Sequence, residues 1–157
     1  MTTLYETEAE DVENAVAVEK KYVAVVDPFS TGAVLASVVC KSGFQVIAVY
    51  SANLEQLANL AGLVPQGLSL SFSSIVAFDE DVEVMASYLK PEDGPLVAVL
   101  AGTETGVELA DKLSEHLGLR TNGTIFSEAR RNKYVMGETV RAAGVRAVKQ
   151  LRAVNWG

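Results

Sequence analysis

The sequence predicts an α/β fold in which a mostly parallel sheet lies between two layers of helices. From Tyr22 onward, short apolar runs rich in β-branched residues alternate with stretches whose apolar residues recur at helical spacing. Each expected strand leads into a helical stretch before the next strand, and such crossovers connect parallel neighbours. The chain has 157 residues, the size of a single domain. A Rossmann-like three-layer sandwich is therefore expected.

The individual elements follow from these runs. Strands are expected at residues 22–26, 45–50, 74–78 and 96–100, and helices at residues 31–42, 54–61, 82–89 and 104–117. A last helix is expected over residues 127–143, with Met136, Val140 and Ala143 buried. Gly144 is expected to end it, because a left-handed helix cap favours glycine.

Charge is unevenly distributed along the chain. The formal net charge is −7, but residues 120–157 hold eight of the 13 Lys and Arg residues and only two acidic ones, so this segment carries +6. The other 119 residues then carry −13, which disfavours nucleic acid wrapped over a broad surface. The basic segment is either a local patch for an anion or a solvated basic helix. Residues 1–20 are acidic and poor in large apolar groups, and we expect a flexible tail there.

Composition disfavours several kinds of protein and site. No apolar run approaches the roughly 20 residues of a membrane-spanning helix, and the N-terminus lacks the features of a signal peptide, so a soluble cytoplasmic protein is expected. The only cysteine, Cys40, lies in an apolar run, and the only histidine, His116, lies far along the chain. A cysteine nucleophile and a zinc site built from Cys and His are therefore disfavoured.

Two turns are expected at the carboxyl ends of strands, where open parallel sheets bind ligands. The first, residues 27–32, offers Ser30 and Thr31 at a helix N-terminus, but it has one glycine where a dinucleotide-binding loop has three. Ser30 and Thr31 are therefore either ligand contacts or plain helix caps.

The second turn, residues 102–106, combines two glycines, two threonines and a glutamate after a wholly apolar strand. Gly102 lets the chain turn sharply, while Glu104 and Thr105 offer contacts to a polar ligand. The alternative is that Thr103 caps the following helix and that Glu104 favours the positive end of its dipole.

A third candidate is the basic run Arg130-Arg131-Asn132-Lys133, expected in the first turn of the last helix. Cations at that position oppose the helix dipole at a cost of roughly a few tenths of a kcal/mol each. The anion that offsets this cost is either a nucleotide phosphate or the nearby Glu128.

Four stretches resemble the N-terminal region of ATP-grasp enzymes, the pre-ATP-grasp domain. They are residues 102–113, 117–119, 132–136 and 142–145, within a likeness that spans Tyr22 to Val148. The likeness is closest to the amino-acid (carboxylate-amine) ligases and more distant to biotin carboxylase and carbamoyl phosphate synthetase. Its most specific part is a lysine that opens a helix ending in Ala-Gly-Val, here Lys133.

The resemblance implies an activity and the residues that serve it. In the family this lysine contacts the ATP phosphates, which assigns ATP binding to Lys133, and the glycine turn borders the substrate cleft. The substrate-side residues are then Gly102, Glu104, Thr105, Ser30 and Thr31. The family reaction uses ATP and magnesium to convert a carboxylate into an acyl phosphate, which an amine attacks. The expected partners are small-molecule carboxylates and amines, with no nucleic acid and no membrane, and a homodimer is compatible with the sequence.

The resemblance covers only the front of such an enzyme. Beyond the position of Gly144 the family continues through a lid with a glycine-rich loop and a domain that carries the metal ligands, whereas this chain ends at Gly157. We therefore expect residues 21–148 to form the pre-ATP-grasp domain and residues 149–157 to begin a linker. No catalytic residue, no metal ligand and no bound ATP or magnesium is expected in this chain alone, which is expected to be inactive.

A stand-alone binding or regulatory domain of flavodoxin-like or receiver-like topology has a similar length and element order. A receiver resembles a site with paired acids after the first strand, an aspartate after the third and a lysine after the fifth. Only Asp27 and Asp79 fit this pattern in part. A structural or regulatory remnant of a ligase is a third alternative.

Overall fold

The structure is a computed structural model that describes residues 19–53, 65, 67, 68 and 70–155. Within these residues the centre of the fold is a sheet of four parallel strands in the order β3-β2-β1-β4. The strands are β1 (Tyr22–Val26), β2 (Gln45–Val49), β3 (Ser74–Val76) and β4 (Leu96–Ala101). The predicted α/β fold with a parallel sheet is confirmed. The third strand is shorter than expected and ends at Val76.

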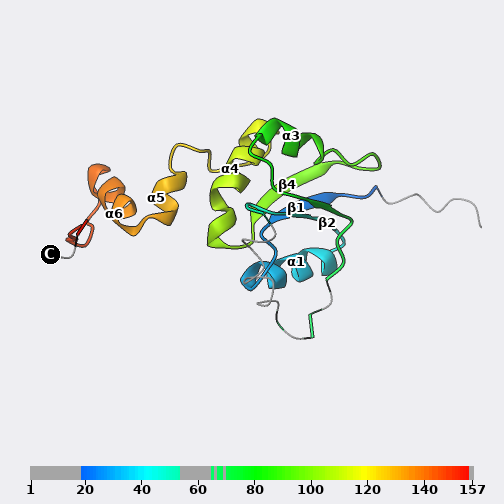
Figure 1. Cartoon of the computed structure of the whole chain (residues 1–157), viewed down its shortest axis with the longest axis horizontal. Coiled ribbons are helices and arrows are strands. Elements are labelled where there is room, and N and C mark those ends of the chain that lie inside the picture. The colour runs from blue at the N-terminus through cyan, green and yellow to red at the C-terminus, as the bar shows by residue number, and fades with distance from the viewer. Residues whose placement is uncertain (1–18, 54–64, 66, 69, 156–157) are drawn as a thin grey trace, which may run out of the picture.

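Helices cover both faces of the sheet (Figure 1). Helix α1 (Thr31–Lys41) lies against one face, and α3 (Val82–Ser87) and α4 (Val107–His116) lie against the other. Two apolar clusters result, because successive strand residues point to opposite faces. In β1, Val23 and Val25 belong to the cluster under α1, whereas Val26 belongs to the cluster under α3 and α4. Since β1 is buried along its whole length, it forms the centre of both clusters.

The prediction of a single last helix is wrong. The chain forms two helices there, α5 (Ser127–Arg131) and α6 (Lys133–Ala142). Asn132 between them has an extended backbone, with φ −89° and ψ 110°, and its side-chain oxygen accepts hydrogen bonds from the backbone N–H groups of Tyr134 and Val135. Asparagine is a favoured helix N-cap, so a new helix begins directly after it.

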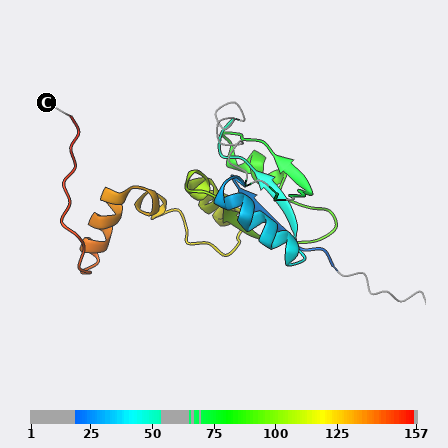
Figure 2. The ribbon, with the colours of Figure 1, turned by 90° about the horizontal axis from the view of Figure 1, so that it is seen from below.

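The burial predicted for this last helix is wrong as well. No residue of α6 is buried: Met136 is half-buried, and Val140 and the following Ala143 are exposed. The reason is the course of the chain, because α6 packs on α5 and lies away from the sheet (Figures 1 and 2). Gly144 follows α6 with a φ of 76°, as expected for a glycine that ends a helix.

Some expectations fall outside the part of the chain that the structure describes. These are the helix at residues 54–61 and residues 1–18 of the expected acidic tail. The helices predicted at residues 31–42, 82–89 and 104–117 are confirmed with small differences at their ends. Among the helices that the structure describes, none has both the length and the apolar character needed to cross a membrane.

Candidate functional site

The two predicted turns meet at the carboxyl edge of the sheet, because β1 and β4 are neighbours. The backbone N–H of Gly102 donates to the carbonyl oxygen of Val26 over 2.7 Å. A Cβ added to Gly32 would lie 2.8 Å from the Cα of Gly102, and one added to Gly102 would lie 2.6 Å from the carbonyl oxygen of Asp27. Only glycine fits at these two positions, so both glycines allow the turns to pack directly on each other.

Asp27 links the ends of three strands. Its side chain is fully buried, and its backbone has a φ of 57°. One carboxylate oxygen accepts from the backbone N–H of Ser51 at 2.9 Å, and the other accepts from the Ser51 hydroxyl at 2.6 Å and from the Thr105 hydroxyl. Asp27 follows β1, Ser51 lies beyond β2, and Thr105 lies beyond β4. These three donors satisfy a carboxylate that would otherwise be costly to bury.

The same buried carboxylate affects its neighbour Tyr50. Burial raises the pKa of the Tyr50 phenol, and the negative charge of Asp27 raises it further. Both effects favour the neutral phenol, because burial and the nearby Asp27 carboxylate each make a negative charge on Tyr50 unfavourable. The polar groups at this edge are therefore arranged around a single carboxylate.

The structure brings most of the predicted substrate-side residues to this edge. Thr31 donates from its hydroxyl to the carbonyl oxygen of Gly102 over 3.4 Å, and the half-buried Ser30 precedes it with a φ of 50°. Thr105 is bound to Asp27, while Glu104 opens the short 3-10 helix η1 (Glu104–Gly106) and is exposed. Glu104 is therefore the predicted residue at this edge whose carboxylate is open to a ligand.

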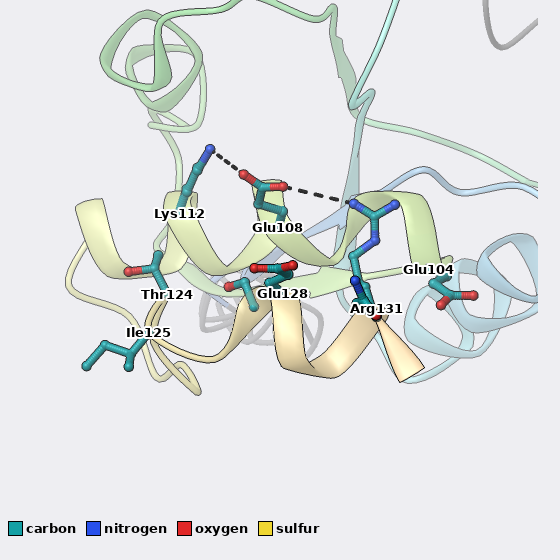
Figure 3. Close-up of a pocket in the computed structure, with 9 residues that line it drawn as sticks. Glu104, Glu108, Lys112, Thr124, Ile125, Glu128 and Arg131 are labelled. Atoms are coloured by element: carbon teal, nitrogen blue, oxygen red, sulfur yellow. Dashed lines mark ion pairs between the residues drawn. The ribbon is translucent and has the colours of Figure 1, made fainter. Parts of the chain in front are cut away.

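A groove runs from Glu104 between α4 and α5 (Figure 3). It encloses about 760 Å³. Its lining residues are Glu104, Glu108, Lys112, Thr124, Ile125, Ser127, Glu128, Arg131 and Asn132. A smaller cavity of about 330 Å³ shares Glu108, Lys112 and Arg131 with it and reaches Ser51 and Thr105 at the sheet edge. The groove and the sheet edge thus form one continuous candidate site.

Glu108 is the central charge of the groove. Figure 3 shows its carboxylate between two cations, with Lys112 Nζ at 2.7 Å and Arg131 Nη1 at 4.0 Å. The hydrogen bond and the charge of Lys112 lower the pKa of Glu108, and the charge of Arg131 adds a smaller effect in the same direction. Glu104 and Glu128 line the same groove without a partner in the ion pairs of the described residues. The groove therefore offers separate cationic and anionic contacts to a polar ligand.

The basic run 130–133 is arranged differently from the prediction. Because the helix breaks at Asn132, Arg130 and Arg131 lie in the last turn of α5, where cations favour the helix dipole, and the predicted unfavourable placement is wrong for these two residues. Arg130 forms an ion pair with the buried Asp111 of α4 and donates to the carbonyl oxygen of Gly123 at 2.7 Å. Arg130 therefore fastens α5 to α4.

Lys133 is not among the residues that line the groove. It is the first residue of α6, it is exposed, and it follows directly on Asn132, which does line the groove. The described ion pairs do not join it to Glu128, the partner that the sequence suggested. In the part of the chain that the structure describes, no three His, Cys, Asp or Glu side chains gather closely enough to hold a metal ion.

Sequence reasoning did not assign a role in the site to Ser51, Glu108 or Lys112, and it weighed Asp27 only for the receiver-like alternative. Asp27 and Ser51 each stand just beyond a buried strand, which is a signal that the sequence contains. Glu108 and Lys112 have the i,i+4 spacing of a helical ion pair, and this too is visible in the sequence. The contribution of Arg131 depends on the packing of α5 on α4, which the sequence pattern did not predict.

Comparisons with known proteins identified relatives by sequence and by fold. It is 31% identical over 133 residues to dapdiamide A synthase of Enterobacter agglomerans, a match that covers 83% of this chain and 30% of that protein. The chain resembles the amino-acid ligases. Its fold matches the crystal structure of L-amino acid ligase from Bacillus licheniformis with a TM-score of 0.54 and 18% identity, over 82% of this chain and 31% of that one. No protein-family model matches the sequence.

The resemblance predicted from the sequence motifs is therefore confirmed, and so is the fold that it implied. The chain spans about three tenths of the length of each of these two relatives. The matched region has the size of a single domain.

We predict that Asp27 and Thr105 act as one stabilising unit. Thr105→Val and Asp27→Asn should each lower the free energy of unfolding by about 1 to 3 kcal/mol, because the first removes one of the donors to a buried carboxylate and the second replaces the charged acceptor with an amide. Asparagine tolerates the left-handed backbone of Asp27, so Asp27→Asn tests the carboxylate rather than the turn. Urea unfolding of the single and double variants measures the effects, which should fall short of additivity by more than about 0.5 kcal/mol.

Thr103→Val is the matched control for this pair. The Thr103 hydroxyl contacts that of Thr105 at 2.8 Å, whereas the Asp27 carboxylate is hydrogen-bonded to Ser51 and Thr105. Thr103→Val should lower the free energy of unfolding less than Thr105→Val does. Strictly additive losses in the double variant would show that the two side chains are not coupled.

We also predict that Lys112 sets the titration of Glu108. Glu108 has a folded-state pKa below its ordinary value of 4.5, so its contribution to stability is present above that value and is lost as the pH falls through the folded pKa. Lys112→Gln should move the pKa of Glu108 back toward 4.5, and Arg131→Gln should move it less. NMR titration of the side-chain carboxyl carbon measures both shifts, and an unchanged pKa in Lys112→Gln would contradict the assignment.

Proposed function

We propose that this chain is the N-terminal, pre-ATP-grasp domain of an ATP-dependent carboxylate-amine ligase that acts on amino acids. The observation that carries the proposal is the match to dapdiamide A synthase, which covers most of this chain but only 30% of the relative. The shared fold with part of an L-amino acid ligase supports the same conclusion. In the proposal, residues 21–148 form this domain and residues 149–157 begin the linker to the ATP-grasp part.

The proposed reaction proceeds through an acyl phosphate. A carboxylate oxygen of one substrate attacks the terminal phosphorus of ATP, and ADP leaves. The amine of the second substrate then attacks the acyl carbon, and inorganic phosphate leaves. Negative charge accumulates on the transferring phosphoryl group, so such sites need cations and bound magnesium. We assign no magnesium ligand and no catalytic residue to the described part of this chain.

The sheet edge is the proposed border of the substrate cleft. Glu104 is exposed at the mouth of the groove, and its carboxylate suits a substrate ammonium group. Thr105 is bound to Asp27, so we give it a positioning role beside Glu104. The two packed turns, one with Ser30 and Thr31 and the other with Gly102, support this border.

Lys133 is the proposed contact to the ATP phosphates. The proposal rests on the resemblance of its helix-opening position to that of the family lysine. Its exposure at the start of α6, next to the groove residue Asn132, leaves its ammonium accessible to a phosphate.

The proposal also places the enzyme in the cytoplasm, with small-molecule carboxylates and amines as partners.

A stand-alone receiver-like domain is less well supported. The acid that would serve its site after the first strand is Asp27, which is fully buried and hydrogen-bonded to Ser51 and Thr105. A receiver-like site requires an open carboxylate at that position. By name, the sequence relative is a synthase and the fold relative is an L-amino acid ligase.

We predict that the 157-residue chain alone releases no phosphate from ATP in the presence of magnesium and a mixture of amino acids. The proposal takes the magnesium ligands and the rest of the ATP site from the ligase part that this chain does not span. A phosphate-release assay on the purified chain tests this. Turnover that disappears on substitution of a residue within this chain would show that the chain is itself an active enzyme.

In a complete ligase that contains this chain, Lys133→Ala should weaken ATP binding by about 1 to 3 kcal/mol, the range for a hydrogen bond to a charged group. Stability should change little, because Lys133 is exposed. Calorimetric titration of ATP measures the difference. Lys149→Ala, at another exposed lysine, is the matched control and should bind ATP like the unmodified enzyme. Equal affinities for ATP in all three proteins would remove Lys133 from the site.

A further inference from the structure

Two consecutive arginines at the end of α5 contact two acids of α4. Arg130 forms an ion pair with Asp111, and Arg131 lies near Glu108. Glu108 and Asp111 are three residues apart, so both lie on the side of α4 that meets α5. The side chains of Arg130 and Asp111 are 29% and 10% exposed, whereas those of Arg131 and Glu108 are 40% and 53% exposed. The contact between the two helices therefore contains one largely buried pair and one open pair.

The buried pair belongs to a small polar cluster. The Asp111 carboxylate accepts from the Ser127 hydroxyl at 2.6 Å as well as from Arg130. Arg130 Nη2 also donates to the carbonyl oxygen of Gly123 at 2.7 Å. The cluster thus joins α4 to the first and last residues but one of α5 and to the loop before it. Helix α5 has only five residues, too few to be stable alone, so these contacts hold it on α4.

The energetics of the cluster favour a role in geometry over a role in stability. A buried ion pair often contributes no more to stability than well-packed apolar residues would. Arg130 Nε is in addition buried without a hydrogen-bond partner among the described residues, which adds a cost. A planar guanidinium has its donors in fixed directions, so it binds Asp111 and Gly123 in one orientation. The pair therefore fixes the direction of the end of α5.

Lys133 lies three residues beyond this fixed point. Between them, the backbone N–H of Asn132 donates to the carbonyl oxygen of Glu128 in α5 at 2.8 Å. The Asn132 side chain accepts from two backbone N–H groups in the first turn of α6. Helix α6 also packs on α5. The start of α6 is therefore tied to the end of α5, and the position of Lys133 depends on the Arg130 contact.

We propose that Asp111 is a positioning residue for the contact of Lys133 with ATP. This inference rests on the proposed function. Asp111 touches no ligand; it holds Arg130 and, through the backbone, the point at which α6 begins. Without it, α5 would occupy several positions on α4, and only some of them would place Lys133 against the phosphates. The apparent affinity for ATP falls in proportion to the fraction of molecules that are ready to bind.

The test is calorimetric titration of ATP into a complete ligase that contains this chain. Asp111→Asn should weaken ATP binding by about fivefold or more, as expected when about a fifth of the molecules hold the binding position. In a Lys133→Ala background the same substitution should change the affinity less than about twofold, because Asp111 acts through Lys133. The KM for ATP should rise with it. The KM for the amino acid should change less, since Glu104 lies in the turn before α4 and not on α5.

Asp93→Asn is the matched control. The Asp93 carboxylate also accepts from one cation and one hydroxyl, those of Lys20 and Tyr22. Asp93 precedes β4 and therefore lies at the amino end of the sheet, opposite the candidate site. Its substitution removes bonds of the same kind far from Lys133. The affinity for ATP should stay within about twofold of that of the unmodified enzyme.

Ser127→Ala covers the case in which Asp111→Asn does not fold. It removes one donor to Asp111 and leaves the ion pair with Arg130 in place. It should weaken ATP binding in the same direction by about threefold, and this loss should also disappear in the Lys133→Ala background.

Three results would overturn the inference. The first is unchanged ATP affinity in the folded variants of Asp111 and Ser127. The second is a loss of the same size in the Lys133→Ala background, and the third is an equal loss in Asp93→Asn. Failure of the proposed function is distinct, because the unmodified ligase would then bind no ATP. A ligase that loses affinity on Lys133→Ala but not on Asp111→Asn would keep the proposed function and reject this inference alone.

Discussion

The contact between the turns after β1 and β4 is the constraint on which the candidate site depends. Gly32 and Gly102 let the two backbones touch, and Asp27 is buried where they meet. A buried carboxylate is tolerated only when its oxygens are hydrogen-bonded, so Ser51 and Thr105 are held in place with it. The carboxyl ends of three strands are joined in this way, and Glu104 lies on a fixed turn at the border of the groove.

A second buried carboxylate fixes the position of α5. Helix α4 begins directly after η1, and its Asp111 binds both Arg130 and Ser127 of α5. Helix α5 therefore has a fixed position on α4, and Arg131 is brought toward Glu108 across the groove. Removing one partner of a buried pair is costly, because it leaves an uncompensated charge. The groove therefore depends on two buried acids, Asp27 and Asp111, neither of which is among the residues that line it.

The sequence predicts the sheet well because each strand is a local, nearly continuous apolar run, as β1 shows along its whole length. The site is less predictable because its key contacts join distant residues, such as Asp27 and Thr105, 78 positions apart. Asn132 shows a different difficulty. The run around it has helical spacing, but its side chain caps a new helix more favourably than it continues the old one. Lys133 opens a separate helix because of that break.

The polar groups of the site fall into two kinds, and the difference bears on function. Thr105 and Arg130 are held by buried carboxylates and position the structure around them. Glu104 and Arg131, their neighbours in the sequence, are exposed and line the groove. A motif assigns a run of residues to a site without separating these roles. Whether a side chain can meet a ligand depends on the hydrogen bonds that it has already made, and these are decided by parts of the chain far from the motif.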